Sequence, residues 1–194
     1  MRSLQLNLEK FSPCFLVAAP QLRDPHFYHT VILLLEYHQD GAMGLVINRP
    51  LNVTLGSVQS PQATIDKIYQ EDSLWYGGPL ASDHILCLYE ATPTAITGDT
   101  EVSRGIAVAA ADSLLASTMQ QRQPFPSAYR ILAGHAGWQP QQLDEEIHAG
   151  TWLVAPIQPE MIFSNQPDNV WNAAMRRLGV NPMYYHDTPT RTVH

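Results

Sequence analysis

The sequence predicts an α+β fold: one domain in which a strongly bent, mixed but antiparallel-rich sheet carries flanking helices. Three observations favour this class. The length of 194 residues is typical of one domain, and no repeat or Gly/Ser linker divides it. Short apolar segments typical of strands outnumber helical segments, and the clearest pair of strands forms a hairpin. Fifteen prolines are spread between these segments, which indicates many turns.

The segment from Thr30 to Pro50 predicts a β-hairpin at the centre of the sheet. An apolar run at 31–35 is followed by the turn signal Gln39-Asp40-Gly41 and a second apolar run at 44–47. Further short apolar segments predict strands at 15–18, 74–76, 85–89, 105–109, 129–132 and 152–155.

Three helices are expected in the second half. The first spans 112–122, with Asp112 at its N-cap. The second begins near Pro140, where proline suits a first turn, and ends at Gly150. The third spans 169–178 and ends at Gly179; its apolar residues fall at helical spacing, which indicates packing against the core rather than a cofactor site.

The charge balance disfavours general nucleic-acid binding. Eleven Lys and Arg oppose 18 Asp and Glu, giving a net charge of −7. Neutralising phosphates needs a basic face, whereas this chain has only two lysines and scattered arginines. We interpret the densest basic cluster, Arg176-Arg177, as the solvated last turn of a helix.

Targeting and redox signals are sparse. The best candidate for a secretory segment, 15–19, is short and ends at Pro20, and no run approaches the length of a membrane span. Cys14 and Cys87 lie in apolar, strand-like settings without a CxxC, which indicates buried reduced thiols. We therefore expect a cytoplasmic protein without a membrane segment.

Common catalytic and cofactor motifs are missing from the sequence. It contains no P-loop, no G-x-G-x-x-G, no G-x-S-x-G elbow and no H-E-x-x-H or paired CxxC. Two weaker spacings remain. His26-x-x-His29 lacks a third ligand nearby, and Glu145-x-x-His148 occurs once, where a di-iron bundle needs it twice. We expect no metal and no cofactor.

Two strings leave alternatives open. Gly134-His135-Ala136-Gly137-Trp138 predicts a Gly-x-x-Gly turn between a strand and the helix near Pro140; it either presents backbone N–H groups to an anion or forms a tight corner plugged by Trp138. Asn48-Arg49-Pro50 places an arginine at a strand end, where it either reaches a ligand carboxylate or phosphate or pairs inside the fold with Glu36. The segment Gly77-Gly78-Pro79 predicts a sharp turn.

These strings also resemble a known family. The segments 15–20, 24–27, 41–50, 77–80 and 134–138, with Gln142-Leu143 and Glu146-Ile147, are similar in sequence and order to the AlgH/YqgE family of bacterial proteins. The string G-A-M-G-L-V-I-N-R-P is the most specific of them. The resemblance implies that the bent sheet folds into a pseudo-barrel. It associates the chain by name with a regulator of alginate production but implies no biochemical activity.

Several positions depart from the family pattern. Leu35 stands where relatives often have a cysteine, so a redox role through that thiol is not expected here. Asp83-His84-Ile85-Leu86 stands where the family usually has Asp-Arg-Gly-aromatic, Tyr89 replaces a histidine, and His135 replaces a tyrosine. If these positions line one surface, histidines stand there in place of an arginine.

Two functions follow from the sequence. The first is a non-catalytic cytoplasmic regulatory or protein-interaction protein, with a protein partner and without nucleic-acid binding. The alternative is a small-molecule-binding protein or enzyme, whose pocket would gather Glu36, Asn48, Arg49, Gly78, His84, Gly134, His135, Gly137 and Trp138. The peripheral segments 1–13 and 181–194 carry no clear pattern.

Overall fold

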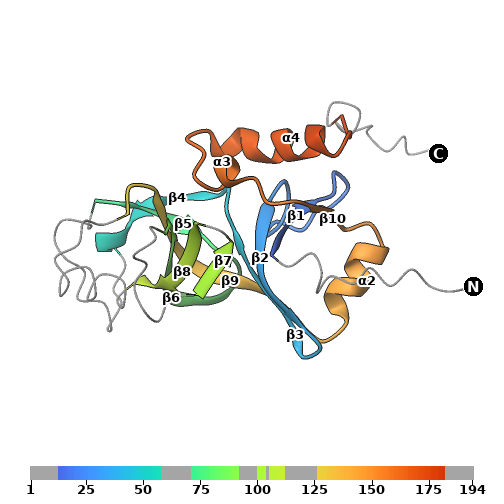
Figure 1. Ribbon diagram of the computed structural model, residues 1–194, viewed down its shortest axis with the longest axis horizontal. Coiled ribbons are helices and arrows are strands. Elements are labelled where there is room, and N and C mark those ends of the chain that lie inside the picture. The colour runs from blue at the N-terminus through green and yellow to red at the C-terminus, as the bar shows by residue number, and fades with distance from the viewer. Residues whose placement is uncertain (1–12, 58–70, 92–99, 104, 112–125, 182–194) are drawn as a thin grey trace, which may run out of the picture.

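The computed structural model describes residues 13–57, 71–91, 100–103, 105–111 and 126–181 (Figure 1). Its strands are β1 (Cys14–Ala18), β2 (Val31–His38), β3 (Gly41–Val46), β4 (Pro50–Thr54), β5 (Ser73–Tyr76), β6 (Leu80–Glu90), β7 (Thr100–Ser103), β8 (Ile106–Ala110), β9 (Tyr129–Trp138) and β10 (Trp152–Ala155). Its helices are η2 (Leu55–Ser57), α2 (Gln142–His148), α3 (Pro159–Ile162) and α4 (Pro167–Arg177).

The strands form one sheet with the order β10-β1-β2-β3-β9-β6-β8-β7, and β4 and β5 branch from it beside β9. All pairings are antiparallel in the described residues except that between β5 and β9. The sheet is thus mixed and antiparallel-rich, as predicted. Its strand path is not closed, so the implied pseudo-barrel is not confirmed.

Strand β9 bends the sheet by joining its two halves. Its first half pairs with β5 and β6, whereas its last residues pair with β3 (Figure 1). Between them Gly134 has a φ of +72°, and a Cβ at this position would lie 2.6 Å from the Gly78 carbonyl oxygen and 2.7 Å from that of Leu80. Glycine is therefore required both by the left-handed conformation and by the close approach of the β5–β6 connection.

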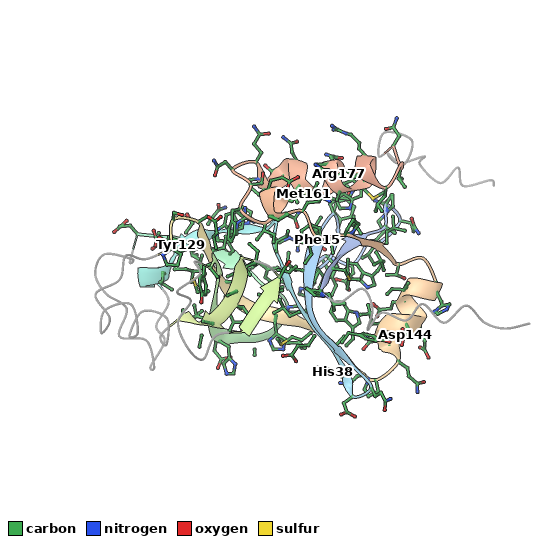
Figure 2. The ribbon with its side chains drawn as sticks, in the orientation of Figure 1. Phe15, His38, Tyr129, Asp144, Met161 and Arg177 are labelled. Carbon is green, nitrogen blue, oxygen red and sulfur yellow. The ribbon has the colours of Figure 1, made fainter. Side chains whose placement is uncertain are left out.

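The core lies around β1, β2 and β3. Every residue of β1 is buried, as are the first four of β2, so both faces of these strands are covered. Phe15 of β1 lies in this interior, while His38 marks the exposed hairpin tip (Figure 2). Continuous apolar runs predict this burial, because a strand covered on both faces needs no polar alternation.

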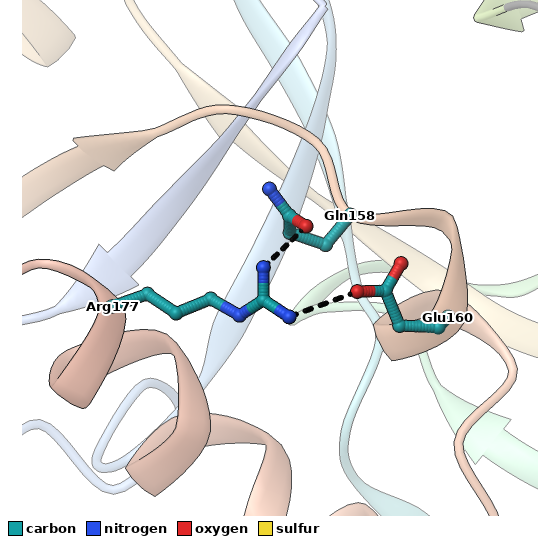
Figure 3. Close-up of polar contacts among 3 residues, drawn as sticks. All are labelled: Gln158, Glu160 and Arg177. Atoms are coloured by element: carbon teal, nitrogen blue, oxygen red, sulfur yellow. Dashed lines mark hydrogen bonds and ion pairs between the residues drawn. The ribbon is translucent and has the colours of Figure 1, made fainter.

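Helix α4 packs its apolar side against β1 and β2. Trp171 of this helix is buried and donates its indole N–H to the carbonyl oxygen of Ala18 at 2.7 Å. Arg177 in the last turn reaches α3, donating to Gln158 Oε1 at 2.6 Å and to Glu160 Oε1 at 3.0 Å (Figure 3). This exposed pair contributes at most about 1 kcal/mol, so packing rather than charge holds the two helices.

The predicted elements agree largely with the structure. The hairpin is confirmed, and the strands expected at 15–18, 74–76, 85–89, 105–109, 129–132 and 152–155 correspond to β1, β5, β6, β8, β9 and β10. The helices near 140–150 and 169–178 are α2 and α4, and both arginines of the basic pair lie exposed in the last turn of α4. The helix expected at 112–122 lies outside the described residues. The sequence patterns did not predict β4, β7 or α3.

The prediction of a turn at Gly134–Trp138 is wrong, because these residues continue β9. Glycine here makes a kink within a strand rather than ending it. None of the described helices is long and apolar enough to cross a membrane.

Candidate functional site

Asn48, a predicted pocket residue, holds the loop between β1 and β2. It is buried at the end of β3, where its Oδ1 accepts the N–H of Val31 at 2.8 Å and its Nδ2 donates to the carbonyl oxygen of His29 at 3.0 Å. The Asn48 side chain thus pairs with a backbone N–H and a backbone carbonyl oxygen where the loop meets β2, and so satisfies both groups.

Arg49 closes the same loop from outside. Its guanidinium donates at 2.8–2.9 Å to three backbone carbonyl oxygens, those of Pro25, His26 and Tyr28. It also lies over the Tyr76 ring, 5.5 Å from the centroid, and there it opposes the rise in the pKa of Tyr76 that burial causes. A fold-internal role for Arg49 is confirmed, but the expected pairing with Glu36 is wrong, since Arg49 bonds to carbonyls and Glu36 is exposed on β2.

Trp138 belongs to a cluster centred on the carboxylate of Glu146. The indole N–H groups of Trp138 and Trp152 donate to Glu146 Oε2 at 2.9 and 2.6 Å, and Gln142 Nε2 donates to Oε1 at 2.8 Å. The two indole rings meet edge to face, 5.9 Å apart. This cluster, which we call the Glu146 clamp, fixes α2 between the end of β9 and β10.

His84 and His135 lie near each other on β6 and β9. Burial lowers the pKa of His135, and the nearby charge of His84 lowers it further. Beside them Leu80 is 47% exposed and contacts the backbone at Gly137, where a Cβ would lie 2.8 Å from Leu80 Cδ1. The two histidines are therefore close enough for their charges to interact, whereas Tyr89, another position that departs from the family pattern, is buried at the other end of β6.

The nine predicted residues fall into separate groups. Asn48 and Arg49 bond to the β1–β2 loop and Trp138 bonds to α2; Gly78 and Gly134 pack backbone to backbone, and Glu36 is exposed on the hairpin. Most of their polar chemistry is thus directed into the fold. A shared role in binding a ligand stays a prediction.

A cleft of about 460 Å³ opens elsewhere, between the sheet and the segment that joins α3 to α4. Its walls come from the start of β4, from β5, from the start of β9 and from residues 163–167. None of the nine predicted residues lines it. Its volume falls within the range of about 300–1,000 Å³ usual for small-molecule sites.

Among the described residues that line this cleft, Arg130 is the charged one. It is only 4% exposed, donates to the carbonyl oxygen of Ile47 and to that of Ser164 at 2.7 Å, and lies 3.8 Å from the centroid of the Trp75 ring. Burial lowers the pKa of Arg130 to about 10, so the side chain stays charged at neutral pH. The sequence offered one signal for it, a charged residue inside an apolar strand, but not its partners.

Other reactive groups are placed structurally. Among the described residues, no group of three His, Cys, Asp or Glu is arranged to hold a metal. His26 bonds through Nδ1 to the Tyr76 hydroxyl at 3.0 Å, and His29 stacks on Trp171. Both cysteines are buried and neither forms a disulfide, as predicted, and burial raises the pKa of Cys14 to about 12, which keeps its thiol protonated.

Comparison with known proteins gives consistent matches. The AlgH-like family matches residues 15–183. A UPF0301 protein of Anaeromyxobacter dehalogenans is 34% identical, covering 88% of this chain and 89% of its own; one of Vibrio cholerae is 31% identical, covering 87% and 91%. The solution structure of AlgH from Pseudomonas aeruginosa matches with a TM-score of 0.70 and 31% identity, covering 91% and 93%. A crystal structure from Corynebacterium diphtheriae matches with a TM-score of 0.72 and 25% identity, covering 91% of both chains.

Proposed function

Because the chain belongs to the AlgH-like family, whose biochemical function is uncharacterised, we propose from its own geometry that it is a non-catalytic regulatory protein that binds a small molecule in the cleft beside Arg130. The observation that carries this proposal is the cleft itself. It combines aromatic walls with a few polar groups, the usual composition of a small-molecule site.

The position of the cleft supports a regulatory role. Arg130 bonds to Ile47 at the end of β3 and to Ser164 between α3 and α4, so one side chain links the sheet to the helical segment. A ligand contacting Arg130 would favour one arrangement of these parts over another. That differential affinity is how a bound molecule shifts a conformational equilibrium toward a partner-binding state.

Binding without catalysis is supported by how the polar residues are used. The side chains of Asn48, Arg49 and Glu146 make hydrogen bonds within the fold, which supports a structural role for them. The cleft wall offers hydroxyl, amide and guanidinium groups, which suit binding.

The test is a thermal-shift screen of the full chain against a library of cytoplasmic metabolites, followed by recovery of each hit. A ligand at 100 times its Kd adds about 2.7 kcal/mol, and we expect a Tm rise of about 5–10 °C. Ser127→Trp, which places bulk at the cleft, should abolish the shift, whereas Gln39→Trp at the exposed hairpin turn should not. Shifts that persist in Ser127→Trp would overturn the site, and chemical conversion of a hit would overturn the non-catalytic role.

A further inference from the structure

We propose that the cleft is an anion site, which takes a small organic molecule bearing one carboxylate or phosphate group against Arg130 and a flat apolar body along the aromatic wall. This inference rests on the proposed function and names the ligand class of the same site. Four features of the cleft carry it: a buried cation, its bonding geometry, the remaining lining and the surrounding charge.

The first feature is the uncompensated charge of Arg130. Removing a guanidinium from water is costly unless an opposite charge accompanies it. Among the described residues, Arg130 has two carbonyl oxygens and an aromatic ring as partners, and no Asp or Glu pairs with it. Carbonyl dipoles satisfy hydrogen bonds but leave the net charge in place, so an anion is the ligand this site stabilises most.

The second feature is the direction of approach. The Trp75 ring covers one face of the guanidinium at 3.8 Å, which directs a ligand to its edge. A guanidinium carries five N–H donors in one plane, and two of them are used by Ile47 and Ser164. The remaining in-plane donors suit carboxylate or phosphate oxygens, which bind arginine edge-on.

The third feature is the rest of the lining. Ser73, Ser127 and Asn165 supply hydroxyl and amide groups for anion oxygens, while Trp75 and Phe163 supply aromatic surface for an apolar body. The cleft also reaches Pro167, the first residue of the 11-residue helix α4, whose N-terminal end favours negative charge. Polar and apolar walls together select an amphipathic molecule over an inorganic ion.

The surrounding charge limits how anionic the ligand is. The chain carries a net charge of −7. Asp72 accepts a hydrogen bond from the hydroxyl of the lining residue Tyr129 at 2.6 Å, and the exposed residue Asp168 is next in the sequence to the lining residue Pro167. These carboxylates repel a polyphosphate, so we infer one anionic group per ligand.

The experiment titrates the full-length protein with phenyl phosphate and benzoate, with uncharged benzamide as the matched neutral probe, at constant ionic strength. Binding is followed by calorimetry and by Trp fluorescence. We expect one saturable site for phenyl phosphate or benzoate and at least tenfold weaker binding of benzamide. Arg130→Gln should weaken the anions at least tenfold, whereas Arg176→Gln, at an exposed arginine of α4, should leave binding unchanged.

A second variant keeps the test decisive if Arg130→Gln does not fold. Ser127→Trp leaves Arg130 in place and adds an indole at an exposed lining position of the cleft, so it should also block anion binding. Equal binding of benzamide and the anions would overturn the anion inference and leave the proposed function standing. If the anions still bind to Ser127→Trp, they bind outside the cleft as adventitious ions only, and the anion inference is overturned. If no probe and no library compound binds, both proposals are overturned.

Discussion

Replacing Glu146 with alanine tests whether the Glu146 clamp stabilises the fold. In the structure this carboxylate accepts three side-chain N–H groups, two of them from the buried indoles of Trp138 and Trp152, which are 7% and 2% exposed. Truncation leaves both indoles without an acceptor. Each unsatisfied buried donor costs about 1–3 kcal/mol, so we expect a loss of about 3–5 kcal/mol in the free energy of unfolding.

Urea denaturation measures this loss directly. The midpoint should fall while the slope m stays constant, because the native state keeps its compactness. In thermal melts the same loss lowers Tm by about 6–20 °C, at about 2–4 °C per kcal/mol for a chain of this size. Glu146→Gln should cost less, about 1–2 kcal/mol, because its amide oxygen still accepts both indoles while its NH₂ group faces the Gln142 donor.

The matched control is Glu145→Ala, one residue earlier on α2 and exposed. It should change stability by no more than about 0.5 kcal/mol, as surface substitutions usually do. If the two alanine variants unfold at the same urea concentration, the hydrogen bonds of the clamp do not stabilise this fold.

Three further predictions follow. Gly134→Ala should lower the free energy of unfolding, measured by urea denaturation, by more than about 3 kcal/mol, because the new Cβ would meet two carbonyl oxygens at 2.6 and 2.7 Å. The control Gly150→Ala has a similar φ but open space around it, so it should lower the free energy of unfolding by about 1–2 kcal/mol. Equal losses would exclude the close approach at Gly134. The folded protein should not react with a thiol reagent at pH 8, because Cys14 is buried with its pKa raised to about 12, and both thiols should react after unfolding; rapid labelling of the native protein would contradict this. His135 has a lowered pKa, so the folded state binds fewer protons than the unfolded state, and its contribution to stability is present above about pH 6.5 and is lost as the pH falls. His84→Gln should raise the pKa of His135 in an NMR titration, and an unchanged value would refute their coupling.

Local patterns were enough to predict most of the fold. The run at 31–35, the turn at Gly41 and the run at 44–47 form a contiguous unit, and the structure confirms them as β2 and β3. The strands β4 and β7 were missed because both are short and neither contains the run of consecutive apolar residues by which the other strands were predicted. The prediction of a turn at Gly134 was wrong for a different reason. Glycine is required there because the β5–β6 connection packs closely against it, and a local sequence pattern does not reveal that contact.

The candidate site was harder to predict, because its parts meet only in three dimensions. Arg49 and Trp138 attract notice as polar or aromatic residues in unusual strings, but their partners are loop carbonyls and a carboxylate on α2. Arg130 offered one signal, a charge inside an apolar strand, but its partners Ile47 and Ser164 lie 83 and 34 residues away in the sequence and could not be predicted from it. Contacts between residues far apart in the sequence therefore determine which of these side chains bond within the fold and which line a cleft.

The strings that identify the family and the residues that line the cleft hardly overlap. Of the described lining residues only Pro50 belongs to one of those strings, while Trp75, Arg130 and Phe163 lie outside them. The strings instead supply the contacts of Asn48 and Arg49, the close approach of Gly134 to the β5–β6 connection, and Trp138, Gln142 and Glu146 of the Glu146 clamp. The family strings therefore contribute to the junction between the two halves of the sheet, whereas the proposed ligand site draws almost wholly on residues outside those strings. It follows that a relative lacking an arginine at the position of Arg130 should keep the fold and lose the preference for an anion.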